Sequence, residues 1–85
     1  MKLSKMKLSV YSLKNILFQG SAASLNCKTT LGEITVLDNH ETMIAVLVAG
    51  LIRIIGDDKK EHGFYIKYGF LEVIPGNEVR CIVEQ

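Results

Sequence analysis

The sequence is poor in the aromatic side chains, and in the excess of positive charge, on which nucleic-acid-binding proteins depend. It contains no tryptophan and only six aromatic residues, three phenylalanines and three tyrosines, whereas proteins that bind single strands stack the bases on aromatic rings. Ten Lys and Arg residues against nine Asp and Glu residues give a net charge of +1, which supplies no excess of cations for the phosphate backbone. We therefore expect no nucleic-acid partner.

Long apolar runs are also missing. The longest uncharged run, between Glu41 and Arg53, has eleven residues and is interrupted by Gly50, whereas a membrane-spanning helix needs about 20 apolar residues. The basic N-terminus has neither the apolar segment nor the cleavage site of a secretory signal. Only two cysteines occur, Cys27 and Cys81; they permit one disulfide, but in a reducing compartment we expect two buried free thiols.

The length of 85 residues excludes a two-domain enzyme with a cleft between its domains, and leaves little interior volume for a deep cofactor site. Hydrophobic residues make up 48% of the chain, which excludes disorder and suggests apolar surface that is buried against a partner protein. We expect one domain at 6–85, preceded by a loose extension at 1–5, with Met6 as an alternative start.

Apolar and polar residues alternate with a period of two, which is typical of β-strands with one buried face. The pattern is clear at 23–28 and nearly so at 78–84, and it directs both cysteines inward. Other short β-branched or aromatic segments lie at 8–13, 16–19, 34–37, 51–55, 64–68 and 70–74. Turn residues, including Gly20, Gly50 and Gly69, are expected to separate them.

Two further segments complete the expected β-structure. The apolar run 43–48 is ambiguous between a helical turn and a strand buried on both faces, and we favour the strand. The charged segment 55–62 has the composition of an exposed hairpin tip. The sequence thus predicts an all-β sandwich or barrel.

Asp38, His40 and Glu41 are the one cluster that suggests a metal site or an acid–base pair. Adjacent ligands in a tight turn seldom converge on one ion without distant help, and the only other histidine, His62, lies beside the charged hairpin. Turn formation is the favoured interpretation. Since the cysteines point inward and no glycine-rich phosphate loop occurs, we expect no catalytic residue, no metal and no cofactor.

Three sequence blocks, in order, are more specific than composition: GEITVLDNHE at 32–41, GLIRI at 50–54 and GFLEV at 69–73. Together with the opening segments LSV at 8–10 and ILFQG at 16–20, they resemble the epsilon subunit of F-type ATP synthases, and the resemblance extends over nearly all of 6–83. It implies a flattened β-sandwich of about ten strands.

The resemblance also implies a function. A protein of this family is a non-catalytic subunit of the central stalk, bound to the gamma subunit and to the membrane c-ring, with alpha and beta subunits in the assembled complex. It would act as a monomer within that complex and help to couple proton translocation to ATP synthesis. We expect it at the cytoplasmic face of a bacterial plasma membrane, with a plastid-encoded origin as a minor alternative.

The family pattern places partner contacts at four residues. Glu33 matches an acidic loop that faces the polar loops of the c-ring, and His40 matches a histidine of the same end, near the gamma and c-ring contacts. Asp38 and Glu41 flank that histidine. The alternatives are a solvated turn charge for Glu33 and a turn or packing role for His40.

The sequence departs from the family pattern at several turns. Asp38, Thr42 and Ala49 stand where proline is common in the family, and Tyr68 replaces the first of two glycines. The family's C-terminal helical hairpin is not matched, so we expect neither inhibition of ATP hydrolysis nor nucleotide sensing.

Two other functions stay open on the residues alone. One is a small barrel of the oligonucleotide-binding type that binds single-stranded nucleic acid, and the other is a small enzyme that uses Asp38, His40 and Glu41.

Overall fold

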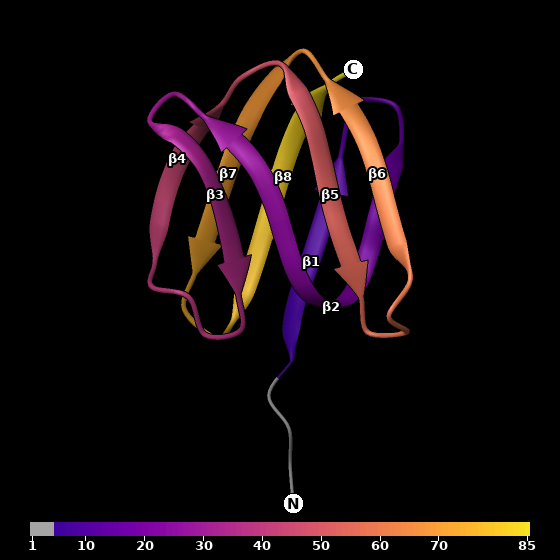
Figure 1. Cartoon of the computed structure of the whole chain (residues 1–85), viewed down its shortest axis with the longest axis vertical. Helices are drawn as coiled ribbons and strands as arrows, with labels where there is room; N and C mark the ends of the chain where they lie inside the picture. The colour runs from indigo at the N-terminus through magenta and orange to yellow at the C-terminus, as the bar shows by residue number, and fades with distance from the viewer. Residues whose placement is uncertain (1–4) are drawn as a thin grey trace, which may run out of the picture.

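The computed structural model describes residues 5–85, which contain strands and turns and no helix (Figure 1). The eight strands are β1 (Met6–Tyr11), β2 (Ile16–Thr29), β3 (Gly32–Leu37), β4 (Met43–Leu47), β5 (Gly50–Gly56), β6 (Glu61–Ile66), β7 (Tyr68–Ile74) and β8 (Glu78–Glu84). The all-β prediction is confirmed. Residues 5–85 contain no helix that could cross a membrane.

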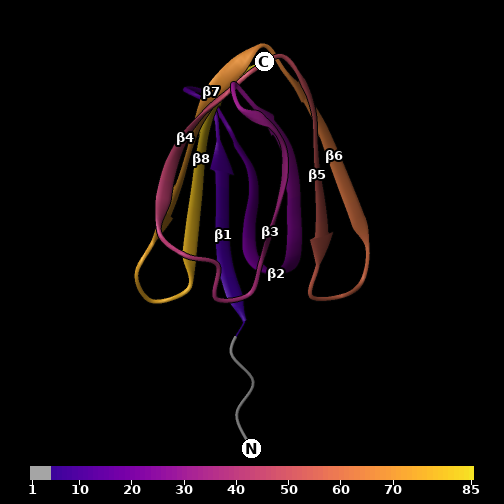
Figure 2. The same cartoon turned by 60° about the vertical axis from the view of Figure 1, so that its left-hand side comes forward.

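The strands form one hydrogen-bonded sheet that folds over itself into two layers. Its order is β1-β8-β7-β4-β2-β5-β6, with β3 added to β2 and a further pairing between β1 and β2. One layer contains β4, β7, β8, β1 and the first half of β2, and the other contains β3, the second half of β2, β5 and β6. Figure 2 shows β7 and β8 on one side of the molecule and β5 and β6 on the other. The predicted sandwich is confirmed.

Strand β2 corrects the prediction that Gly20 is a turn between two separate strands. Gly20 lies inside a single strand of 14 residues, which follows a curved path between the two layers in Figure 1. The backbone of Gly20 has φ of +147°, a conformation that other residues rarely adopt. A register irregularity between Ala22 and Ser24 adds to the bend. Because the segments predicted at 16–19 and 23–28 merge here, the nine strand segments predicted from the sequence become eight strands in the described residues, fewer than the about ten that the family resemblance implies.

The core lies between the layers and is made of the inward rows that the alternation predicts. Cys27 on β2 and Cys81 on β8 are both fully buried free thiols, as expected. Val79 and Val83, two residues before and two residues after Cys81, are also buried, whereas Ile82 points outward and is 47% exposed. The other buried apolar residues are Met6, Leu8, Val10, Ala22, Leu25, Val36, Leu47, Ile52, Ile54, Ile66, Leu71 and Val73.

The ambiguous segment at 43–48 is a strand, as favoured, but the expectation that both of its faces are buried is wrong. Ile44 is 74% exposed and Val46 is also exposed, while Leu47 is buried. Strand β4 pairs along its length with β7 and makes only one pairing, Thr29 with Leu47, to β2. Its apolar run therefore supplies both a core row and a row on the outer surface.

The charged segment between β5 and β6 is the hairpin tip that the sequence predicts. The Gly56 N–H donates to the Lys60 carbonyl at 2.9 Å, and Lys59 adopts a positive φ of 68°. The Lys5 ammonium group donates to both carboxylate oxygens of Asp57, at 2.8 and 2.9 Å. Of the predicted extension at 1–5, residues 1–4 lie outside the described residues.

Gly69, which we expected in a turn, lies inside β7, where its missing side chain permits a close backbone approach. A Cβ atom at this position would lie 2.5 Å from the Ile82 carbonyl oxygen and 3.0 Å from Val83 Cα. Both obstacles are backbone atoms of β8, so they cannot move aside as a flexible side chain does. Glycine at this position thus allows β7 to pair with β8 in the observed register.

We expect the substitution Gly69→Ala to destabilise the fold by about 2 kcal/mol or more, since overpacking against backbone forces a shift of the strands. Gly63→Ala is a matched control, because a Cβ at this strand glycine meets only the Leu51 side chain, at 3.4 Å, and then the Ile52 carbonyl oxygen at 3.9 Å. Urea unfolding of both variants measures the difference. Equal stability of the two variants would contradict the close approach at Gly69.

Candidate protein-interaction interface

The outer face of the first layer carries a continuous row of apolar side chains. The register pairs Val46 with Phe70, Phe70 with Ile82, Ile82 with Tyr11 and Tyr11 with Ile16. Directly opposed residues on neighbouring strands point to the same side of a sheet and lie in contact range. The row thus crosses β4, β7, β8, β1 and β2 without a polar interruption.

Four of these five side chains are exposed in the described chain, and Tyr11 is half-buried. Phe70 is 56% exposed and Ile16 is 67% exposed, and Ile44 extends the surface from the next outward position of β4. A contiguous apolar patch of this kind is uncommon on a soluble monomer and marks an interaction site. We call this surface, with the row and Ile44, the apolar face.

The outer face of the second layer has a different chemistry. Arg53 on β5 donates through Nε to Glu61 on β6 at 2.8 Å, and this bond, followed by the charge of Arg53, lowers the pKa of the Glu61 carboxyl. Asn26 donates to the Thr35 hydroxyl at 2.9 Å. The exposed apolar side chains on this face are scattered, as on any protein surface, so the apolar face is the better candidate interface.

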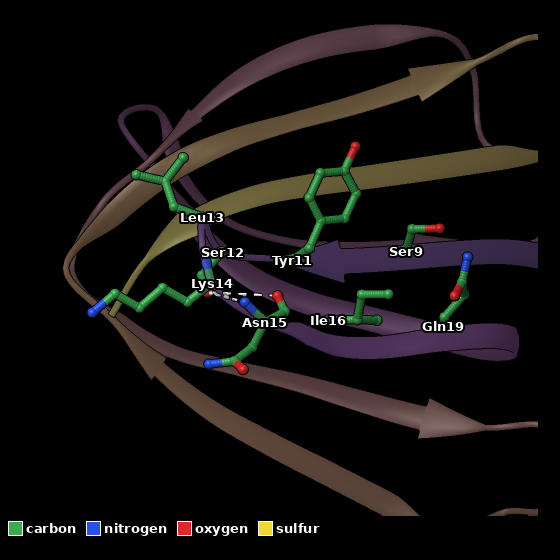
Figure 3. A pocket seen from close by; sticks show the side chains of 8 residues that line it. All are labelled: Ser9, Tyr11, Ser12, Leu13, Lys14, Asn15, Ile16 and Gln19. Atoms are coloured by element: carbon green, nitrogen blue, oxygen red, sulfur yellow. Dashed lines mark hydrogen bonds between the residues drawn. The ribbon is translucent and has the colours of Figure 1, made fainter.

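Two shallow hollows mark the apolar face. One lies at the β1–β2 hairpin, where Figure 3 shows Tyr11, Leu13 and Ile16 around it. The Ser12 hydroxyl shapes the loop, since it accepts hydrogen bonds from the backbone N–H groups of Lys14 and Asn15 at 3.3 and 3.2 Å. The other hollow lies over β4, β7 and β8 and is lined by Ile44, Phe70, Leu71, Glu72, Arg80 and Ile82.

The structure does not bring the four predicted contact residues together. Glu33 is the second residue of β3, whereas Asp38 follows the last residue of that strand, with His40 and Glu41 beyond it. Five residues of extended strand span about 17 Å. Figure 1 shows the β2–β3 turn at the upper end of the molecule and the β3–β4 loop at the lower end, so the residues belong to opposite ends of the sandwich.

Asp38 has a structural partner that the sequence did not reveal. Its carboxylate accepts a hydrogen bond from the Asn77 side-chain amide at 2.6 Å, and the Asn77 side-chain oxygen accepts one from the Asn39 N–H at 2.8 Å. Asn39 and Asn77 each have φ of 59°, a left-handed conformation that asparagine tolerates. The β3–β4 loop is therefore attached to the β7–β8 turn by one side chain, 38 and 39 residues away in sequence.

His40 and Glu41 lie in the same loop, and the hydrogen-bond contacts of His40 are to backbone carbonyl oxygens rather than to other ionisable side chains. The His40 backbone N–H donates to the Leu37 carbonyl at 3.2 Å, and its ring Nδ1 lies 2.8 Å from the Glu41 carbonyl oxygen. Among residues 5–85, no group of three or more His, Cys, Asp or Glu side chains could hold a metal ion. The geometry supports a turn role for this loop.

We expect the substitution Asn77→Asp to loosen the β3–β4 loop, because it places a carboxylate against that of Asp38 and removes the amide donor. A loss of about 1 kcal/mol in unfolding free energy is expected for these exposed groups. The double variant Asp38→Asn/Asn77→Asp restores a donor and an acceptor in swapped positions and is expected to recover most of the loss. Wild-type stability of Asn77→Asp, measured by urea unfolding, would contradict this role.

The buried thiols are chemically inert at neutral pH. Burial, with a smaller contribution from the charge of Glu33, raises the pKa of the Cys27 thiol from 9.0 to about 11. Burial also raises the pKa of Cys81, with Cys27 as the second cause. A nucleophile requires a thiolate, and the burial that the inward alternation predicts disfavours the thiolate form of both cysteines.

The raised thiol pKa makes the fold less stable in alkali. Between pH 9 and 11 the unfolded chain loses the Cys27 proton while the folded chain keeps it, so unfolding free energy falls as the pH rises through this range. We expect a slope from Cys27 of up to about 1.4 kcal/mol per pH unit. Cys27→Ala, although less stable overall, should show a shallower slope in urea unfolding from pH 8 to 11. An unchanged slope would contradict the assignment of this pH dependence to Cys27.

Comparison with known proteins gives a consistent result. A family model described as the beta-sandwich domain of the ATP synthase delta/epsilon chain matches residues 5–85. The ATP synthase epsilon chain of Aquifex aeolicus is 33% identical over 69 residues, which cover 81% of this chain and 51% of that protein. The epsilon chain of Clostridium novyi is 36% identical over 67 residues, which cover 79% of this chain and 51% of its own length. The chain thus spans about half the length of these relatives.

A solved structure shares the fold. A chain in the cryo-EM structure of the OSCP/F1/c-ring part of the Euglena gracilis mitochondrial ATP synthase superposes with a TM-score of 0.89. The identity is 21%, and the superposition covers 98% of this chain and 52% of that one. At this identity the likeness shows the fold alone.

Proposed function

The chain belongs to the ATP synthase delta/epsilon family, whose β-sandwich domain matches residues 5–85, and from that premise we propose that it is a non-catalytic central-stalk subunit. Its partners in this proposal are the gamma subunit and the c-ring, with the alpha and beta subunits in the assembled enzyme. The family match supports this proposal over a nucleic-acid-binding barrel. The described residues offer a docking surface rather than a reaction centre.

The single observation that carries the proposal is the apolar face. Its row of five side chains runs across five neighbouring strands, and these strands also supply the core on their inner side. A surface of this kind loses its contact with water when a partner covers it, which favours association. We propose that the gamma subunit covers this face.

The predicted contact residues enter the proposal in two groups. Glu33 lies at one end of β3, and we propose that this end meets the polar loops of the c-ring. His40 and Glu41 lie at the other end, where we propose contacts to gamma, and Asp38 positions their loop through Asn77. Charges at a rim of this kind orient partners more than they strengthen binding.

The sandwich would then transmit rotation between the c-ring and gamma, and so help to couple proton translocation to ATP synthesis. Two hydrogen-bonded layers with a close-packed core resist deformation, which suits an element that transmits torque. The place of action in this proposal is the cytoplasmic face of a bacterial plasma membrane. There the chain would be a peripheral component, held by its partners.

We expect Phe70→Asp, within the apolar row, to weaken binding to the gamma subunit by about 30-fold or more, since a buried charge at an interface core costs about 2 kcal/mol or more. Tyr65→Asp is the matched control, because Tyr65 is an aromatic residue on β6 that is 75% exposed on the outer face of the second layer. Titration calorimetry with purified gamma from the same organism measures both affinities, and circular dichroism checks the fold.

Two results would overturn the stalk role. One is a wild-type chain that fails to bind gamma, and the other is a Tyr65→Asp variant that loses affinity while Phe70→Asp keeps it.

A further inference from the structure

The hollow over β4, β7 and β8 differs from the rest of the apolar face because it combines an apolar lining with an ion pair at its edge. We propose that this hollow receives one tyrosine side chain of the partner, as the anchor of the interface. The inference rests on the proposed stalk function for the identity of the partner. It rests on the geometry of the hollow for the chemistry of the occupant.

The size of the hollow fits a single side chain. Its volume is 240 Å³, which is below the range of about 300–1,000 Å³ typical of pockets for small-molecule ligands. Protein interfaces concentrate their binding energy in a few large side chains that fill such hollows, and tyrosine, tryptophan and arginine are the most frequent. A partner side chain is therefore a better occupant than a metabolite.

The lining requires an occupant with an apolar body. Ile44 from β4, Phe70 from β7 and Ile82 from β8 contribute apolar side chains to it, and all three are about half exposed or more. An arginine would place a charged group against this lining. An aromatic ring buries more apolar area than any aliphatic side chain, and it can stack edge-on or offset against Phe70.

The edge of the hollow selects the polar end of the occupant. Arg80 Nη1 lies 3.7 Å from Glu72 Oε1, and Arg80 Nε lies 3.7 Å from Glu78 Oε2, which are ion-pair distances beyond hydrogen-bond length. Both Arg80 and Glu72 therefore keep hydrogen-bonding capacity for a third group. The attraction of a cationic end to Glu72 is offset by its repulsion from Arg80, and the reverse holds for an anionic end, so the ion pair favours neither charge.

A neutral hydroxyl satisfies both groups at once, because it donates to the Glu72 carboxylate and accepts from the Arg80 guanidinium. Phenylalanine has no polar atom to offer, and the tryptophan indole only donates. Serine and threonine have the hydroxyl but lack the apolar body. Tyrosine alone combines the ring that the lining requires with the donor and acceptor that the edge requires.

The probe for this inference is p-cresol, which has the ring and hydroxyl of a tyrosine side chain, compared with toluene, which lacks the hydroxyl. Each is titrated into the isotope-labelled chain and followed by NMR. We expect p-cresol to shift the methyl signals of Ile44 and Ile82 and the ring signals of Phe70. We also expect it to bind about 5-fold more tightly than toluene, as one additional hydrogen-bonded hydroxyl allows.

A pair of double variants separates the hollow from general effects of charge. Glu72→Leu/Arg80→Leu removes the ion pair at the hollow and is expected to abolish the preference for p-cresol over toluene. Glu61→Leu/Arg53→Leu is the matched control, because it removes an ion pair of the same residue types from the other outer face and is expected to leave the preference unchanged.

Three results would overturn the inference: no binding of p-cresol, equal affinity for p-cresol and toluene, or shifts centred on Tyr11 and Ile16 in the hairpin hollow of Figure 3. The probe requires no partner, so the two proposals fail separately. A wild-type chain that binds gamma but not p-cresol would overturn the tyrosine anchor alone. A chain that binds p-cresol in the hollow but not gamma would overturn the stalk role alone.

Discussion

Strand β2 is the constraint on which the rest of the structure depends. It is hydrogen-bonded to β1, β3, β4 and β5, and its two halves belong to different layers. Leu25 and Cys27 on its inner side are completely buried. Because one strand bends from the first layer into the second, the layers are joined along their backbone as well as through their core, and their inner rows are held face to face.

Each layer also has an outer face, and the two outer faces differ in their chemistry. The first layer presents apolar residues in register across five strands, with Glu72 and Arg80 in the adjacent row. The second presents hydrogen-bonded polar groups and the Arg53–Glu61 ion pair. The charged groups of the second face disfavour docking at that face, whereas the apolar face of the first layer favours association with a partner. In the proposed stalk role, the apolar face is the broad surface that gamma covers, and the polar face stays in water.

Much of the fold was predictable because a period of two reports directly which side of a strand is buried. The inward cysteines and the β5–β6 hairpin follow from residues close together in sequence. The turns predicted at Gly20 and Gly69 were wrong, because the lack of a side chain suits strand bends and close backbone contacts as well as turns. The Asp38–Asn77 bond and the apolar row were not predictable, since both depend on strand register between residues distant in sequence. For the same reason, Glu33 and His40 looked like neighbours although the length of β3 separates them.

The exposure of the apolar row is best understood through what the core already contains. Sixteen apolar residues form the buried core, and none of them belongs to the outer row. Gly69 brings β7 close to the backbone of β8, and this approach places Phe70 directly opposite Ile82. The same glycine that permits strand pairing therefore aligns the surface row. The hydrophobic free energy of that row is released only when a second protein covers it, and the stability of the sandwich and its affinity for a partner come from opposite sides of the same strands.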